Sequence, residues 1–207
     1  MNVKRIILAS ASPRRREVLE KIGLKFDVIP SDADENISKD MPCGEYVSAL
    51  AKLKGESVRD ALIKKGEDLS ETLIISCDTV VYYDKMIIGK PKSDLDARLT
   101  LGMLSDSWHG VFSGLCLILG DTEICEYAET DVKFAEISER DIERYVATGE
   151  PKGKAGSYAI QGRAAAFVEK IDGDYYNVVG FPLALFSRMM KYDLGISVFD
   201  QGDENDR

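Results

Sequence analysis

Two hydroxyls and two arginines lie close together near the start of the chain, in the segment Ser10 to Arg15 (SASPRR). Ser12 and Pro13 are typical of a helix N-cap and first turn, so the hydroxyls should face the free backbone N–H groups of a helix. Arg14 and Arg15 at that end oppose the helix dipole, which favours a bound anion. The segment therefore indicates a phosphate site, and the alternative is an ordinary capped helix with solvated arginines.

A carboxylate with a neighbouring hydroxyl, Asp78-Thr79, follows an apolar run at 73–76 that predicts a buried strand. Ligands of α/β proteins usually bind at the carboxyl edge of the sheet, where Asp78 should lie. A carboxylate at that position costs desolvation free energy unless it is paired, hydrogen-bonded or bound to a metal. Asp78 is therefore a candidate catalytic or metal-binding group, with an aspartate that simply opens a turn as an equally good alternative.

Two lysines and one amide could complete a site for an anionic ligand. Lys54 lies in a predicted helix, Lys90 in a Gly-Lys-Pro loop, and Gln161 in a glycine-rich segment at 149–168. An ammonium group can neutralise a phosphate, and glycines let the backbone approach a ligand closely. Taken separately, each lysine is more often a solvated surface residue, and a glycine-rich segment can be a structural loop.

The elements that must position these groups alternate between strands and helices. The hydrophobic patterns predict strands at 3–9, 25–29 and 73–76, hairpins at 80–88 and 111–134, and short strands at 159–162, 166–171 and 175–179. Capping residues and helical periodicity predict helices at 12–22, 44–65, 93–104, 138–148 and from 182 onward. This mixture predicts an α/β fold, a mixed twisted sheet with flanking helices, in two lobes around a central cleft.

The composition is that of a folded protein, with 207 residues of which 44% are hydrophobic and 30% charged. These values exclude a disordered, collagen-like or disulfide-scaffold protein. No repeat, linker or low-complexity segment interrupts the order of the elements. We therefore predict a single catalytic domain over residues 1–195 and an acidic, solvated tail over residues 196–207.

The net charge of −9 argues against a nucleic-acid partner. Residues 1–17 nevertheless carry five basic side chains against one acidic side chain, which would attract a small polyanion. The longest aliphatic runs, such as 115–119, are far shorter than the ~20 residues that span a bilayer, so we expect no membrane partner. The N-terminal apolar run is also too short for a signal peptide, and the predicted location is the cytoplasm.

The four cysteines form no C-x-x-C pair, and two of them lie inside apolar strand-like runs. We predict free, structural thiols in a reducing compartment. His109 is the only histidine, which disfavours a Cys/His zinc site and suggests a hydrogen-bonded structural histidine. Any metal should be a hard cation with oxygen ligands. The motifs of dinucleotide oxidoreductases, α/β-hydrolases and P-loop proteins are absent.

The order of these motifs resembles that of the Maf-like nucleotide pyrophosphatases, over residues 3–194. The shared patterns are S-x-S-P-R-R at 10–15, an acidic loop ending in Glu35, L-A-x-x-K at 50–54, D-T-V at 78–80, G-K-P at 89–91, K-A-G-x-Y-x-I-Q-G at 154–162 and N-V-V-G-x-P-L at 177–183. The chain departs from the family at Gly153, where Asp is usual, and this removes one carboxylate from that neighbourhood. Cys77 in place of Ala and Ser113 in place of Thr are milder departures.

The resemblance implies the fold of Maf and inosine triphosphate pyrophosphatase-like proteins, and a cytoplasmic hydrolase that forms a homodimer. Such an enzyme cleaves a nucleoside triphosphate between the α and β phosphates with the help of a divalent cation, Mg²⁺ or Mn²⁺. The products are a nucleoside monophosphate and pyrophosphate. Arg14, Thr79 and Gln161 match the family members that use dTTP and UTP, so the implied substrates are pyrimidine triphosphates, including modified uridine nucleotides.

The resemblance also implies roles for individual residues, with Asp78 at the position of the catalytic carboxylate. Glu35 and Asp78 would hold the metal. Whether Asp78 activates the attacking water or serves mainly as a metal ligand is left open, because the two carboxylates could exchange roles. The implied substrate-binding residues are Ser10, Ser12, Arg14, Arg15, Lys54, Thr79, Lys90 and Gln161.

Two other functions fit the same residues. Maf proteins are linked to inhibition of septum formation, so a nucleotide-sensing regulator of cell division without significant turnover is the first alternative. A phosphatase that releases inorganic phosphate is the second. Identifying the product formed from each triphosphate would distinguish the three functions.

Overall fold

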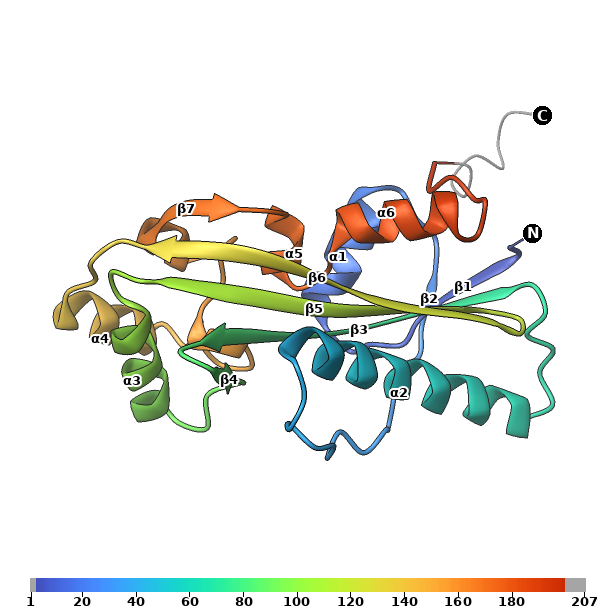
Figure 1. Ribbon diagram of the computed structural model, residues 1–207, viewed down its shortest axis with the longest axis horizontal. Helices are drawn as coiled ribbons and strands as arrows, with labels where there is room; N and C mark the ends of the chain where they lie inside the picture. Colours follow the sequence, from blue (N-terminus) through green and yellow to red (C-terminus); the bar gives the residue numbers. More distant parts are fainter. Residues whose placement is uncertain (1–2, 200–207) are drawn as a thin grey trace. The chain divides into compact units, whose positions relative to one another are not determined.

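The computed structural model describes residues 3–199 of the chain (Figure 1). These residues form two compact units, each built from several chain segments. Unit 1 contains the described residues up to 78 together with 113–128 and 180–199, and unit 2 contains 79–112 and 129–179. The prediction of a solvated tail over 196–207 is wrong at its start, because Ile196 and Val198 are buried. Residues 200–207 lie outside the described residues.

A mixed sheet supplies the strands of the fold, as the sequence predicts. The described strands are β1 (Arg5–Leu8), β2 (Asp27–Val28), β3 (Thr72–Tyr83), β4 (Met86–Ile88), β5 (Trp108–Leu119), β6 (Thr122–Phe134) and β7 (Val168–Asp172). They are arranged in the order β2-β1-β3-β5-β6-β7, and β4 pairs with β3. Strand β1 is parallel to β2 and β3, whereas β4 and β7 are antiparallel to their neighbours. The mixed α/β fold is therefore confirmed.

Unit 1 carries the helices α1 (Pro13–Lys21), α2 (Cys43–Lys64) and α6 (Leu183–Tyr192). Helices α2 and α6 lie on opposite faces of the unit 1 strands (Figure 1). The inner stripe of α2 packs with β1, β3 and β5 in a buried apolar cluster of Ile7, Ala9, Ala51, Val58, Leu62, Ile74, Cys116 and Ile118. No helix within residues 3–199 has the length and apolar character needed to cross a membrane.

Two glycines allow α2 to approach the sheet closely. A Cβ added to Gly55 would lie 2.7 Å from the Ser76 Oγ of β3. A Cβ added to Gly114 of β5 would lie 2.0 Å from the Val47 carbonyl oxygen. Backbone atoms cannot yield as the end of a flexible side chain can, so Gly114 fixes the distance between α2 and β5.

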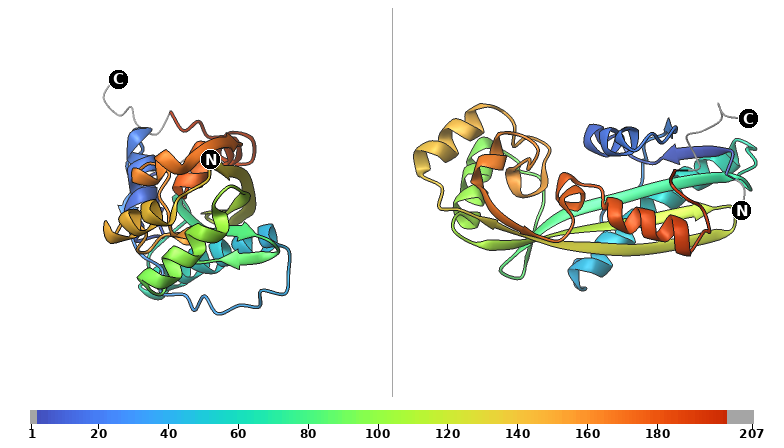
Figure 2. Two further views of the ribbon diagram at one scale, coloured as in Figure 1. Left: turned by 90° about the vertical axis from the view of Figure 1, so that its left-hand side faces the viewer. Right: turned by 90° about the horizontal axis from the view of Figure 1, so that it is seen from above.

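Unit 2 carries the helices α3 (Asp94–Leu104), α4 (Glu139–Ala147) and α5 (Tyr175–Val179) and the 3-10 turns η1 (Ala155–Ser157) and η2 (Arg163–Phe167). Helices α3 and α4 lie side by side (Figure 2). The predicted caps are confirmed, because Ser93 Oγ accepts a hydrogen bond from the Asp96 N–H and Ser138 Oγ accepts one from the Asp141 N–H. These bonds satisfy backbone donors that a helix start leaves unpaired.

Two strands predicted in unit 2 are wrong. Residues 159–162 form a turn, in which the Gly162 N–H donates to the Ala159 carbonyl. Residues 175–179 form α5, because the Asp174 carboxylate accepts from the Tyr176 N–H at the start of this turn and Asn177 is buried inside the unit. The Asn177 Nδ2 donates to the Val111 carbonyl, 66 residues away, and this long-range contact overrides the local strand propensity.

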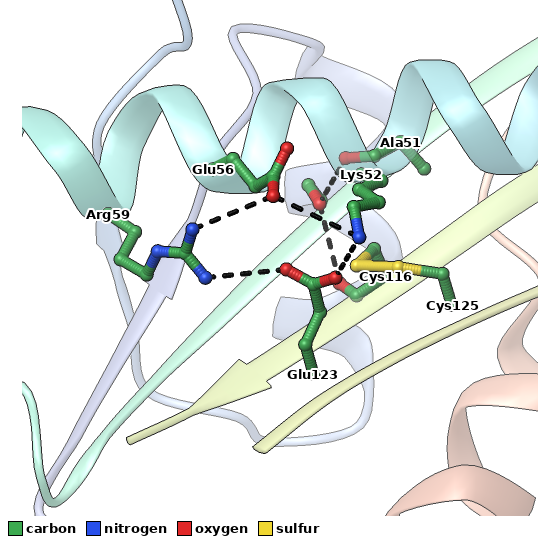
Figure 3. The surroundings of a disulfide bond; sticks show 8 residues. Ala51, Lys52, Glu56, Arg59, Cys116, Glu123 and Cys125 are labelled. Atoms are coloured by element: carbon green, nitrogen blue, oxygen red, sulfur yellow. Dashed lines mark hydrogen bonds and ion pairs between the residues drawn. A yellow bond between two sulfur atoms is a disulfide. The ribbon is translucent and has the colours of Figure 1, made fainter. Parts of the chain in front are cut away.

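The prediction of four free thiols is also wrong, because Cys116 of β5 and Cys125 of β6 form a disulfide (Figure 3). The two cysteines flank the β5–β6 turn and are separated by nine residues, so the hairpin brings them face to face. A cross-strand pair of this kind has no C-x-x-C spacing, so the sequence pattern did not predict it. Cys43 and Cys77 are buried free thiols, as predicted.

His109 is a buried structural histidine, as predicted, with 3% of its surface exposed. Its Nε2 lies 2.9 Å from the Tyr158 hydroxyl oxygen, and its ring contacts Phe134 edge to face. Burial lowers the pKa of His109 to about 4, because desolvation disfavours the charged imidazolium. The folded protein therefore keeps this residue neutral.

We expect the free energy of unfolding to depend on His109 in mildly acidic solution. The unfolded chain takes up a proton near pH 6.5, whereas the folded chain takes it up only near pH 4. Lowering the pH through this window should therefore cost the wild type about 3 kcal/mol that the variant His109→Gln does not lose. Urea unfolding of both proteins from pH 7 to pH 4 measures the difference, and parallel pH profiles would contradict it.

Ser157 has a left-handed backbone, with a φ of 62°, although it is not a glycine. Its hydroxyl is buried and has no hydrogen-bond partner among the described residues. We expect Ser157→Gly to raise the free energy of unfolding by about 1 kcal/mol, because it relieves the backbone strain and removes the unpaired hydroxyl. Ser157→Ala keeps the strained backbone, so a denaturant titration in which Ala equals or exceeds Gly would refute the strain argument.

Candidate active site

Three charged side chains that are distant in the sequence meet in unit 1. The Lys54 Nζ lies 2.5 Å from Asp78 Oδ1 and 3.1 Å from Glu35 Oε2. Helix α2 carries Lys54, and Glu35 comes from the irregular segment before α2. Asp78 lies in the middle of strand β3, so the prediction that it follows the end of a strand at the carboxyl edge of the sheet is wrong, because 73–76 and 80–83 form one continuous strand. The fold therefore brings together the two carboxylates and one of the two lysines that the sequence singled out.

Burial differs among the three groups. The side chains of Lys54 and Asp78 are 12% and 13% exposed, whereas that of Glu35 is 57% exposed. Removing one partner of such a shielded pair leaves a charge with little access to water, which costs about 3–5 kcal/mol in buried pairs. Lys54 and Asp78 thus form the inner part of the site, and Glu35 forms its solvent-facing side.

Contacts between strand β3 and helix α2 hold Lys54 and Asp78 in place. The Ser76 Oγ, two residues before Asp78, donates to the Ala51 carbonyl, three residues before Lys54, at 2.7 Å. Together with the close approach at Gly55, this bond aligns β3 and α2 beside the ion pair. A carboxylate and an ammonium on rigid elements are better preorganised than the same groups on loops.

Tyr46 is a site residue that the sequence analysis did not single out. It lies on α2 two helical turns before Lys54, and 7% of its surface is exposed. Burial, reinforced by the negative charges of Asp78 and Glu35, raises the pKa of Tyr46, so its phenol stays protonated. The available signal was the i, i+4, i+8 spacing of Tyr46, Leu50 and Lys54, which places all three on one helix face.

The predicted phosphate segment forms a compact turn in unit 1. Ser12 occupies the N-cap of α1 and Pro13 its first turn, as predicted, although the Ser12 side chain makes no capping hydrogen bond. Instead, Ser10 Oγ accepts from the Ser12 N–H at 3.2 Å and from the Arg15 Nη1 at 3.1 Å. Ser10 therefore organises the turn that precedes the helix.

Arg15 also connects this turn to a distant part of unit 1. Its Nε donates to the Gly180 carbonyl at 2.9 Å, across 165 residues of sequence. The Cys77 Sγ approaches the same carbonyl oxygen at 3.7 Å. The Gly180 carbonyl thus ties the start of α1 to the residue that precedes Asp78. Arg14, its neighbour on α1, is half-buried.

Unit 2 contains the other three predicted site residues, Thr79, Lys90 and Gln161. Thr79 is half-buried, and Lys90 and Gln161 are exposed. The Gly156 N–H donates to the Gly89 carbonyl at 3.2 Å, so the loop that carries Lys90 is bonded to the segment that leads to Gln161. These contacts place two polar side chains on segments that support each other.

The two carboxylates of the candidate site, Glu35 and Asp78, suit a metal that takes few ligands from the protein. No group of three or more His, Cys, Asp or Glu side chains within residues 3–199 forms a metal-binding cluster. Mg²⁺ commonly binds one or two carboxylates and completes its shell with water and substrate phosphates. Asp78 and Glu35, held on either side of one ammonium group, fit such a cation.

The comparison with known proteins covers nearly the whole chain. Residues 5–192 match the Maf-like protein family. A dTTP/UTP pyrophosphatase of Caldicellulosiruptor bescii is 42% identical over 93% of this chain and 98% of its own length. One from Agathobacter rectalis is 42% identical over 95% of this chain and all of its own. One from Bacillus cereus is 40% identical over 92% of this chain and 90% of its own.

Among solved structures, the Ham1 protein of Staphylococcus aureus aligns with a TM-score of 0.44 and 18% identity. The alignment covers 64% of this chain and 73% of that chain. The matches to the three pyrophosphatases are much stronger than this structural match, since they cover nearly all of both chains at 40–42% identity. The chain belongs to the Maf-like protein family.

Proposed function

We propose that this protein hydrolyses nucleoside triphosphates, preferably dTTP and UTP, to the nucleoside monophosphate and pyrophosphate. The observation that carries the proposal is the shielded Lys54–Asp78 pair with Glu35 at 3.1 Å from the same ammonium. Relatives named dTTP/UTP pyrophosphatase, 40–42% identical over more than nine-tenths of this chain, support the reaction and the substrate class.

In this mechanism Asp78 accepts a proton from the water that attacks the α-phosphorus, or orients that water. The ammonium of Lys54 balances the charge of Asp78 and faces the phosphates, and Glu35 shares the same ammonium. A bound Mg²⁺ or Mn²⁺, held by Glu35 and Asp78, would neutralise charge that develops on the departing pyrophosphate. Tyr46 keeps a neutral hydroxyl near these carboxylates.

Substrate binding is proposed for the side chains of the predicted phosphate segment at 10–15 and for Lys90 of the Gly-Lys-Pro loop. A triphosphate carries about four negative charges, so several fixed cations are needed to hold it. Arg14 and Lys90 would contact phosphate oxygens directly. Arg15 and Ser10 would act by shaping the turn before α1, because their side chains already bond to each other.

Base selection is proposed for Thr79 and Gln161, with Arg14 as the third position shared with pyrimidine-specific members. A hydroxyl and an amide can pair with the polar edge of a pyrimidine. A site that hydrogen-bonds one base edge rejects a different base strongly, since the wrong base leaves buried polar groups unpaired.

The regulator without turnover is not favoured, because relatives that match nearly the whole chain are named for a hydrolytic reaction. A phosphatase would release inorganic phosphate, so identification of the product separates it from a pyrophosphatase.

We also propose a single catalytic domain over residues 1–195, a homodimer and a cytoplasmic location. Gel filtration with light scattering would test the homodimer, and cell fractionation would test the location.

We expect Asp78→Asn to reduce pyrophosphate release from dTTP by about a hundredfold or more, because an amide cannot accept the proton of water. The protein should remain folded, since an amide oxygen can still accept a hydrogen bond from Lys54. A coupled pyrophosphate assay measures turnover, and thermal unfolding checks the fold. Asp121→Asn, in the exposed β5–β6 turn, is the matched control. Near-wild-type turnover by Asp78→Asn would remove Asp78 from the mechanism.

Removal of divalent cations should silence the enzyme. The basic side chains of the protein alone would neutralise too little of the negative charge on the departing pyrophosphate. We therefore expect EDTA to lower turnover of dTTP by a factor of about 100 or more. Adding back excess Mg²⁺ or Mn²⁺ should restore it. Undiminished activity in excess EDTA would show that Lys54 and the arginines suffice without a metal.

A further inference from the structure

A cavity of about 340 Å³ lies in unit 2 and shares no residue with the proposed active site. It is formed by the end of β3, the β3–β4 turn, the start of β5 and one residue of β6. This volume is at the lower end of the range in which proteins bind small organic molecules. The cavity is lined by Tyr82, Tyr83, Asp84, Trp108, His109, Gly110 and Asp131.

The two carboxylates of this cavity have no cationic partner among the described residues. The ion pairs described within unit 2 join Arg98 to Glu143 and Lys133 to Asp106, and they include neither Asp84 nor Asp131. Both carboxylates are exposed at the rim, where a ligand can reach them. The cavity therefore presents two carboxylates that take part in none of the described ion pairs.

Charges of both signs lie near Asp131, since Lys133 and Lys170 form the next pair on the same face, but its directly paired residue is acidic. Asp172 of β7 lies directly opposite Asp131 in the β6–β7 register. Like charges directly opposite one another on neighbouring strands destabilise the pairing. Glu129, two residues before Asp131, has its pKa raised by burial and also by the Asp131 charge. A bound cation would relieve this repulsion.

The aromatic walls indicate what kind of cation would bind. Trp108 is 44% exposed, and Tyr82 and Tyr83 line the same cavity. The ammonium of Lys170 lies over the Trp108 ring, 5.5 Å from its centroid, so this ring already takes part in one cation–π contact. Guanidinium and ammonium groups bind such rings through the ring quadrupole, and carboxylates add charge-assisted hydrogen bonds.

A bare metal ion and a nucleotide fit this cavity poorly. No cluster of three His, Cys, Asp or Glu side chains suited to a metal ion exists in the described chain. The phosphates of a nucleotide would be repelled by Asp84 and Asp131. We propose that this cavity is a second ligand site that binds an organic cation bearing a guanidinium or primary ammonium group.

The test uses the natural reporter in the cavity, because Trp108 is the only tryptophan of the chain. The whole protein is titrated with arginine amide, with spermidine, and with citrulline amide, a neutral match for arginine amide, at constant ionic strength. We expect saturable changes in tryptophan fluorescence with the two cations, with half-saturation at millimolar concentration or below, and none with citrulline amide.

The double variant Asp84→Asn/Asp131→Asn should weaken cation binding at least about tenfold, since it removes both charges while keeping the shape of the cavity. Asp121→Asn serves as the control for loss of a surface carboxylate. The proposal is overturned if neither cation gives a saturable change, if citrulline amide binds equally well, or if the double variant binds as the wild type does.

This readout does not depend on catalysis. Pyrophosphate release from dTTP, measured on the same preparations, reports separately on the proposed function. Loss of cation binding with normal turnover would refute only the second site, and saturable cation binding in a protein that never hydrolyses dTTP would refute only the proposed reaction.

Discussion

The site of this protein depends on one interaction, the ion pair between Lys54 and Asp78. Each side chain is largely shielded from water, so the two opposite charges 2.5 Å apart stabilise each other, and Glu35 further balances Lys54. The pair in turn requires α2 to lie close to β3, which the Ser76–Ala51 hydrogen bond and the absence of a side chain at Gly55 make possible. Packing and charge are therefore coupled, and a bulkier residue at position 55 would disturb both.

The remaining motifs are held by hydrogen bonds to backbone carbonyls, with no ion pair in either of the two contacts described. The Gly180 carbonyl accepts a hydrogen bond from the Arg15 Nε, and the Gly89 carbonyl accepts one from the Gly156 N–H. Exposed ion pairs elsewhere, such as Arg98–Glu143, contribute little, because water screens them. An anionic substrate would thus meet groups whose positions are set before it binds, which limits the reorganisation that binding costs.

Much of the fold was predictable because the signals are local. Ser93 and Ser138 begin helices with the expected caps, and the apolar stripe of α2 faces the sheet. The short segments of unit 2 were not predictable in the same way. Residues 175–179 have strand propensity, yet they form a helical turn because Asn177 bonds to backbone far away in the sequence. The partner of Cys116 was missed for a similar reason, since it depends on the register of a hairpin.

The sequence by itself determined which groups are available: the serine and arginine turn before a helix, one carboxylate after a buried apolar run, and a lysine on an amphipathic helix. Residue type and near-neighbour spacing encode such features directly. Only the tertiary structure decided that Lys54 bridges Glu35 and Asp78, that Arg15 bonds to Gly180, and that an aromatic, acidic cavity forms around Trp108. These contacts join residues that are far apart along the chain, so their distances depend on strand order and helix packing, which no local pattern specifies.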